Sequence, residues 1–174
     1  MRKATIGKYF AICVAAAAIA PLTLAAAPVM AGNGDGHGGG GNDKEVVLKV
    51  TGTDTSSFGN DRDPVPGTIF GFAGTNVLTE TNAPFGTFGA VCTFVANTDT
   101  GETTQCQETL ETPYGQITLQ GIKTEPHGTP GDFREAVTGG TGSFSRASGW
   151  AEFHNDTGSG IAITLHLYGV EKCW

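Results

Sequence analysis

The residues best placed to do chemistry lie on the last extended run of the chain, 161–168, which reads I-A-I-T-L-H-L-Y. Four apolar residues alternate there with Ala162, Thr164, His166 and Tyr168, which is the period of a β-strand with one apolar and one mixed face. If the mixed face lines an interior, His166 and Tyr168 are polar groups in apolar surroundings, and we take them as candidate catalytic residues. If it faces outward, they belong to the surface.

Other side chains on extended runs are candidates for the wall of such a site. The ligand-binding candidates are Phe70, Phe72, Phe94, Trp150 and Arg134. The alternative is that aromatic residues at strand positions form an ordinary core. Glu135 follows Arg134 directly, so on a strand the two face opposite sides and cannot both serve one site. His127 and His154 stand beside turns, where a solvated histidine is the alternative.

Cys92 and Cys106 lie on two extended runs on either side of a turn centred near Asp99. Equal offsets from that centre place them opposite each other if the register follows the turn, near enough to form a disulfide. Closing a loop of about 15 residues stabilises a fold by roughly 3 kcal/mol in the chain-entropy model. Cys173 is then free or bonded to another chain.

Several familiar chemical motifs are excluded. A glycine run, 139–142, could be mistaken for a phosphate cradle, but a strand pattern follows it where a cradle needs a helix N-terminus. The sequence has no G-x-S-x-G, no H-E-x-x-H and no paired C-x-x-C. Asp61 and Asp63 lack the spacing of a calcium loop, and His37 stands alone, so we expect no metal site and no cofactor.

The chain begins with the pattern of a secretory signal. Residues 1–31 combine a basic start, an Ala-rich apolar run and the cleavage-like tripeptide V-M-A, and a retained membrane anchor is the alternative. Residues 32–43 are rich in glycine and contain no apolar residue, so we expect a disordered leader. Residues 44–174 are then one domain, and the protein is expected to be secreted, without a stable membrane anchor.

Net charge and composition limit which partners and which fold class are expected. Loss of the three basic residues of the signal would change the net charge from −7 to −10, which argues against nucleic acid or an anionic membrane as a partner. The 27 glycines and the lack of an amphipathic helical period favour an all-β chain with tight turns. Extended runs are expected at 45–51, 68–81, 86–96, 102–111, 115–122, 133–138, 144–153 and 161–168. A polar loop is expected at 53–67.

Two segments carry a family resemblance. The run A-V-T-G-G-T-G-S-F, at 136–144, follows Y-G-Q-I-T-L-Q-G, at 114–121, and the pair is similar to plant allene oxide cyclases. The portion from Gly139 to Gly149 resembles dirigent proteins. Both belong to a superfamily of eight-stranded barrels that includes bacterial spirotetronate cyclases, and the resemblance covers roughly 86–169. It implies an eight-stranded antiparallel up-and-down β-barrel. Because related barrels often associate through their outer walls, it also implies a possible homo-oligomer.

The resemblance implies a barrel that binds an apolar small molecule in its lumen and steers its cyclisation, isomerisation or stereoselective coupling. Cys92 matches a cysteine near the substrate of the plant cyclases, but its expected disulfide removes the thiol, and the first strand offers only Glu45 where those enzymes carry a Glu and an Asn. Allene oxide cyclase activity itself is therefore not expected. The alternative is a non-catalytic secreted barrel that carries a ligand or serves as a structural module.

Overall fold

Alternation of apolar and polar residues at every second position shapes the chain into eight strands. The computed structural model describes residues 44–59, 65–127, 131–156 and 160–170; the predicted signal and leader, Asp61, Asp63 and Cys173 lie outside them. The strands are β1 (Val46–Gly59), β2 (Ile69–Leu78), β3 (Pro84–Thr98), β4 (Gly101–Thr112), β5 (Gly115–Glu125), β6 (Phe133–Gly140), β7 (Ser148–Asp156) and β8 (Gly160–Tyr168). One 3₁₀ turn, η1 (Gly142–Phe144), joins β6 to β7.

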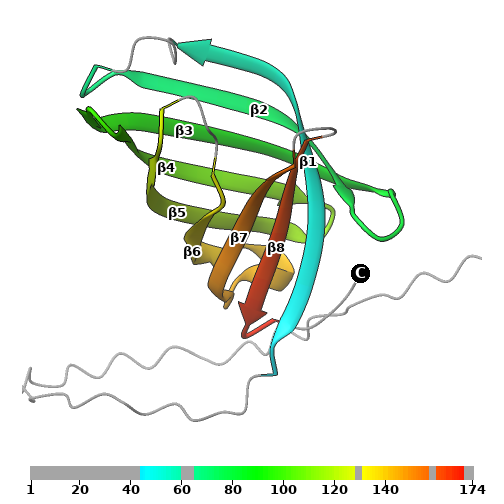
Figure 1. The fold of residues 1–174 in the computed structure, drawn as a ribbon. Coiled ribbons are helices and arrows are strands. Elements are labelled where there is room, and N and C mark those ends of the chain that lie inside the picture. Colours follow the sequence, from blue (N-terminus) through cyan, green and yellow to red (C-terminus); the bar gives the residue numbers. More distant parts are fainter. Residues whose placement is uncertain (1–43, 60–64, 128–130, 157–159, 171–174) are drawn as a thin grey trace, which may run out of the picture. The chain divides into compact units, whose positions relative to one another are not determined.

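The strands close into a barrel. Each strand pairs antiparallel with the next in sequence, and β1 pairs with β8, as Figure 1 shows for the cyan and red strands. Val50 of β1 lies opposite Leu78 of β2 on one side and Ile163 of β8 on the other. The expected all-β, eight-stranded antiparallel up-and-down barrel is confirmed, because sequential hairpins and one closing pair account for every ladder.

Two expected boundaries were wrong. The polar run from Thr53 to Gly59 is not a loop: it extends β1 and pairs with β2 beyond a bulge between Asp54 and Ser56. Its exposed threonines and serines lack the apolar alternation on which the prediction relied, because they lie near the end of the barrel rather than over its core. Phe144 does not begin a strand, since it lies in η1 with no exposed surface, and β7 starts at Ser148.

One end of the lumen is filled by apolar side chains. This end includes the start of β1, the end of β8 and the turn η1. The buried residues of the core, most of them at this end, are Leu48, Val50, Phe85, Phe88, Leu110, Ile117, Leu119, Val137, Phe144, Ala147, Ala151, Phe153, Ile163, Leu165 and Leu167. Burial of this set is the main stabilising contribution to the barrel, at about 25 cal/mol for each Å² of apolar surface removed from water.

Toward the other end, formed by the end of β1, the start of β2 and the β3–β4 hairpin, burial is uneven: Cys92, Phe94, Thr104 and Cys106 are buried, but other inward side chains are not. Phe70, Phe72 and Phe133 point inward with the buried residues of their strands, yet each is only partly buried. The Lys123 and Glu125 side chains at the end of β5 keep 21% and 22% of their surface exposed. Apolar side chains therefore plug one end of the lumen, and the other end, where inward side chains of β2, β5 and β6 are only partly buried, is called the open end.

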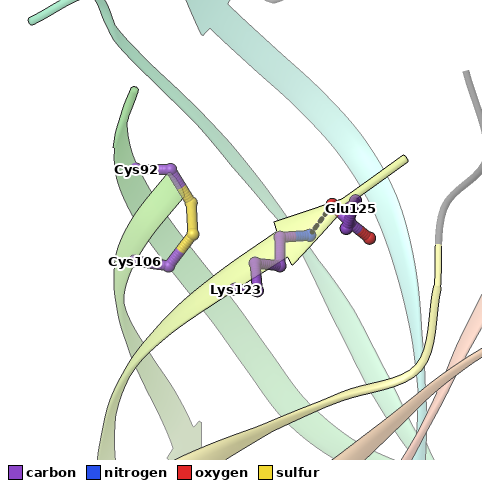
Figure 2. The surroundings of a disulfide bond; sticks show 4 residues. All are labelled: Cys92, Cys106, Lys123 and Glu125. Carbon is purple, nitrogen blue, oxygen red and sulfur yellow. Dashed lines mark ion pairs between the residues drawn. A yellow bond between two sulfur atoms is a disulfide. The ribbon is translucent and has the colours of Figure 1, made fainter. Parts of the chain in front are cut away.

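The predicted disulfide is present. Cys92 of β3 and Cys106 of β4 are cross-strand partners with Cα atoms 4.1 Å apart, and both sulfurs lie inside the barrel wall (Figure 2). The bond joins two neighbouring strands of one hairpin, so it strengthens the wall beside the open end without crossing the lumen.

Removing this bond should weaken the fold but leave the barrel intact. For a Cys92→Ala, Cys106→Ala double variant we expect the free energy of unfolding to fall by about 3 kcal/mol, since the denatured chain regains the entropy of a loop of about 15 residues. Urea unfolding followed by circular dichroism measures this loss. Wild-type protein held in reductant is the control for side-chain truncation and should lose a similar amount. An unchanged midpoint in both samples would contradict the prediction.

Candidate functional site

Two glutamates occupy inward-facing positions directly above the apolar plug. Glu108 of β4 lies between the buried residues Ala90 and Leu119 on the neighbouring strands, and Glu135 of β6 lies opposite the buried Ala151. Glu108 is 7% exposed and Glu135 is 4% exposed. Carboxyl groups are rarely buried this deeply without a partner, because loss of hydration penalises the charged form.

The burial changes the protonation of both groups. The pKa of Glu108 is raised to about 8, mainly by loss of water and also by the negative charges of Glu135 and Asp54, while Lys123 acts in the opposite direction. Burial likewise raises the pKa of Glu135 to about 7, again opposed by Lys123. The two carboxyls interact electrostatically, so near neutral pH the pair holds at least one proton and offers both a hydrogen-bond donor and an acceptor.

The space for Glu135 comes from a glycine on the adjacent strand. A Cβ atom at Gly121 would lie 2.8 Å from Cγ of Glu135, closer than a real Cβ contact. One carboxylate oxygen of Glu135, Oε2, is buried and has no hydrogen-bond partner in the structure. A buried polar atom without a partner is uncommon in native proteins, so this oxygen is a candidate contact for a bound group.

A lysine marks the open end of the same lumen. Nζ of Lys123 lies 2.8 Å from Glu125 Oε2 and 4.2 Å from the centre of the Phe133 ring. Figure 2 shows this ion pair on β5, beside the disulfide of the neighbouring hairpin. Oε1 of Glu125 also accepts a hydrogen bond from the Gly131 backbone N–H at 3.0 Å. The ammonium group is thus already held by one carboxylate and one aromatic face.

Three predicted ligand-binding residues lie on the inward face. The Phe70 and Phe94 rings are 4.9 Å apart, and Phe72 packs edge-on against Phe88 at 6.3 Å between ring centres. These rings form the β2–β3 wall of the lumen, across the barrel from Glu135. Their role as ligand contacts stays a prediction, but their placement is the one that such a role requires.

The structure places the other predicted site residues on the outer face. Ile163, Leu165 and Leu167 of β8 are at most 1% exposed and fill the lumen, so His166 and Tyr168 point outward, the alternative that the sequence left open. Burial of the apolar face inside the barrel decides the orientation, and the catalytic role of both residues stays a prediction.

The outward-facing candidates nevertheless gather in one cluster. Trp150 stacks on His166 with 4.6 Å between ring centres and lies 6.1 Å from Tyr168. Nδ1 of His166 is 2.6 Å from Glu45 Oε1, and the Arg134 guanidinium is 2.6 Å from Glu152 Oε1. These contacts hold the four side chains on the outer wall of the barrel and account for their conformations.

The other two histidines in the described part of the chain, His127 and His154, are exposed. His127 lies 3.0 Å from Glu102 and 2.7 Å from the Thr98 carbonyl, which together raise its pKa, and His154 lies 2.8 Å from Asp132. Among the described residues, no group of three or more His, Cys, Asp or Glu side chains is arranged to hold a metal ion. In the same part of the chain, no helix is long and apolar enough to cross a membrane.

Sequence reasoning missed Glu108 and Lys123 and gave Glu135 no role. A signal was present: Cys106, Glu108 and Leu110 share one face of β4, so an acidic residue stands in register with a cysteine and a leucine. The same alternation places Glu135 with Val137 on β6. An acidic residue in the apolar register of a strand is an indicator of a functional carboxyl.

The raised pKa values predict a stability that depends on pH. Between the unfolded value, near 4.5, and the folded values of about 7 and 8, the native state binds more protons than the unfolded chain, so stability falls as pH rises through this range. Glu135→Gln should remove part of this slope and stabilise the barrel above pH 8, on the order of 2–4 kcal/mol. Urea unfolding at pH 5, 7 and 9 measures it.

The matched control is Glu111→Gln. Glu111 lies on β4 as Glu108 does but is exposed on the outer face, so its substitution should leave the slope unchanged. Parallel pH profiles for Glu135→Gln and wild type would show that the carboxyl is not held in its protonated form.

Comparisons with known proteins agree with the fold. No family model and no curated protein matches the sequence. Among solved structures, a pyocyanin demethylase is 22% identical, with a TM-score of 0.61, over 70% of this chain and 99% of that one. An exo-specific intermolecular Diels-Alderase is 16% identical, with a TM-score of 0.64, over 74% and 100%. A pterocarpan synthase dirigent protein is 14% identical, with a TM-score of 0.52, over 74% and 96%. The chain therefore has the barrel fold of dirigent proteins and Diels-Alderases, and the predicted resemblance is confirmed at the level of the fold.

Proposed function

We propose that the protein is a secreted barrel that binds a largely apolar small molecule at the open end of its lumen and steers the cyclisation, isomerisation or stereoselective coupling of that molecule. The observation that carries the proposal is the pair of buried carboxyls, Glu108 and Glu135, on the floor of a lumen with phenylalanine walls. Ligand sites combine an apolar lining with a few convergent polar groups, as this lumen does.

The chemistry proposed for the pair is proton transfer and hydrogen bonding. A carboxyl whose pKa is near neutral can give a proton to a developing negative charge and take it back, which general acid–base catalysis requires. The phenylalanine walls hold the molecule in a reactive shape, which can lower a barrier by several kcal/mol without further groups. In this proposal Glu108 and Glu135 act on the ligand, while Phe70, Phe72 and Phe94 orient it.

The comparisons support this proposal only by analogy. Proteins with the same fold are described as a demethylase, Diels-Alderases and pterocarpan synthase dirigent proteins, all of which act on small organic molecules. Because one fold carries many reactions, the reaction here is inferred from the carboxyl pair and not from the fold. Secretion is proposed from the signal pattern of residues 1–31.

The test has two stages. Native mass spectrometry of the mature protein from its own culture medium should show an added mass, and extraction should yield the molecule. With that molecule, Glu108→Gln should slow conversion by about 100-fold or more, because the proton donor is lost. Chiral chromatography of the products measures both rate and steric course.

Glu111→Gln is again the control, since it makes the same chemical change on the outer face of the same strand. A barrel that is empty when purified and takes up neither polyenes nor phenolics would overturn the proposal in favour of the structural module. If a molecule is bound but never converted, the catalytic part of the proposal would be wrong and the protein would be a ligand carrier.

A further inference from the structure

The charges that face the lumen do not balance. Four acidic residues line the lumen or act on its buried carboxyls: Asp54, Glu108, Glu125 and Glu135. The cation among the described residues that acts on Glu108 and Glu135 is Lys123, and its ammonium group is bound to Glu125. Within the described ranges, the buried pair therefore has no ion pair with a cation, and Oε2 of Glu135 has no hydrogen-bond partner.

The basic residue nearest in sequence cannot supply that charge. Arg134 precedes Glu135, but on a strand consecutive side chains face opposite sides, and the Arg134 guanidinium is bound to Glu152 on the outer wall. Taking a carboxylate out of water costs several kcal/mol unless an opposite charge compensates. The lumen avoids this cost by keeping the carboxyls protonated while it is empty.

Lys123 shows how the lumen binds a positive charge. Its ammonium group lies between the Glu125 carboxylate, at 2.8 Å, and the face of the Phe133 ring, at 4.2 Å. A cation over an aromatic face gains about 0.5–2 kcal/mol, more when water is excluded. Deeper in the barrel, carboxyls and aromatic rings again share the lumen: Glu108 and Glu135 are inward-facing, as are the phenylalanines of β2 and β3.

We propose that the lumen selects organic monocations, meaning apolar molecules that carry one positively charged nitrogen, with that nitrogen placed between the Glu108–Glu135 pair and the phenylalanine rings. This inference rests on the proposed function and names its ligand class. One carboxyl loses its proton to balance the bound charge, and the other keeps its proton and remains the donor that the chemistry needs. Binding of a permanent cation therefore releases a proton to solvent.

The experiment compares two probes of one shape. Phenyltrimethylammonium is permanently charged, and tert-butylbenzene has nearly the same volume without the charge, so their difference in affinity reports charge selection alone. At pH 9, where the pair is more fully ionised, we expect the cation to bind at least about tenfold more tightly than the hydrocarbon. This preference should shrink toward pH 6, because protonation removes the negative charge.

Isothermal titration calorimetry of the mature protein measures the two affinities. Repeating the titration near pH 7 in buffers of different ionisation enthalpy measures the number of protons released on binding. Glu135→Gln should remove most of the difference in affinity between the two probes and most of the proton release. Glu111→Gln, which removes a surface charge of the same strand, should leave both unchanged and so excludes general attraction to an acidic protein. Unfolding curves confirm that each variant is folded.

The outcomes separate this inference from the function on which it rests. Equal or tighter binding of tert-butylbenzene at every pH would overturn cation selection and leave the apolar lumen site standing. A cation preference that survives in Glu135→Gln but is lost in Glu111→Gln would move the charge recognition to the outer wall and overturn the inference. Binding of neither probe would overturn the lumen site and cation selection together.

Discussion

Closure of β1 on β8 is the constraint on which the rest of the structure depends. Once the last strand pairs with the first, every residue of every strand lies either in the lumen or on the outer wall, and neighbours in sequence take opposite sides. The apolar faces of β1 and β8 then fill one end of the lumen through Leu48, Leu165, Leu167 and their neighbours. No further layer is needed to form a core.

This plug is also what makes the carboxyl pair unusual. Because apolar side chains close one end of the barrel, a group just above them is screened from water on that side and from the sides by the wall. Glu108 and Glu135 stand at this boundary, and the small residues Ala90, Gly121 and Ala151 beside them leave room for their side chains. The same packing that stabilises the barrel therefore raises the pKa of both groups.

The sequence allowed the eight strands, their order and the disulfide to be predicted, because alternation and turn residues are local signals. It failed where local pattern and tertiary position diverge: the run from Thr53 to Gly59 lacks apolar alternation yet pairs with β2, and Phe144 continues an extended pattern yet lies in η1. It could not decide which face of β8 points inward, since His166 and Tyr168 suit either side. Glu108 was overlooked because the burial of an acidic residue is set by strands distant in sequence.

Arg134 and Glu135 show how this constraint leads to function. In a helix or a loop, an arginine beside a glutamate can fold back and neutralise it. On a closed barrel it cannot, because the wall separates the two side chains: Arg134 binds Glu152 outside, and Glu135 remains inside with an unpartnered oxygen. Among the described residues, the lysine that acts on this pair, Lys123, is already held by Glu125, so the proposal assigns the compensating charge to a bound molecule. The alternation that builds the wall thus separates Arg134 from Glu135. This separation is the structural basis of the proposed binding of a cation in the lumen.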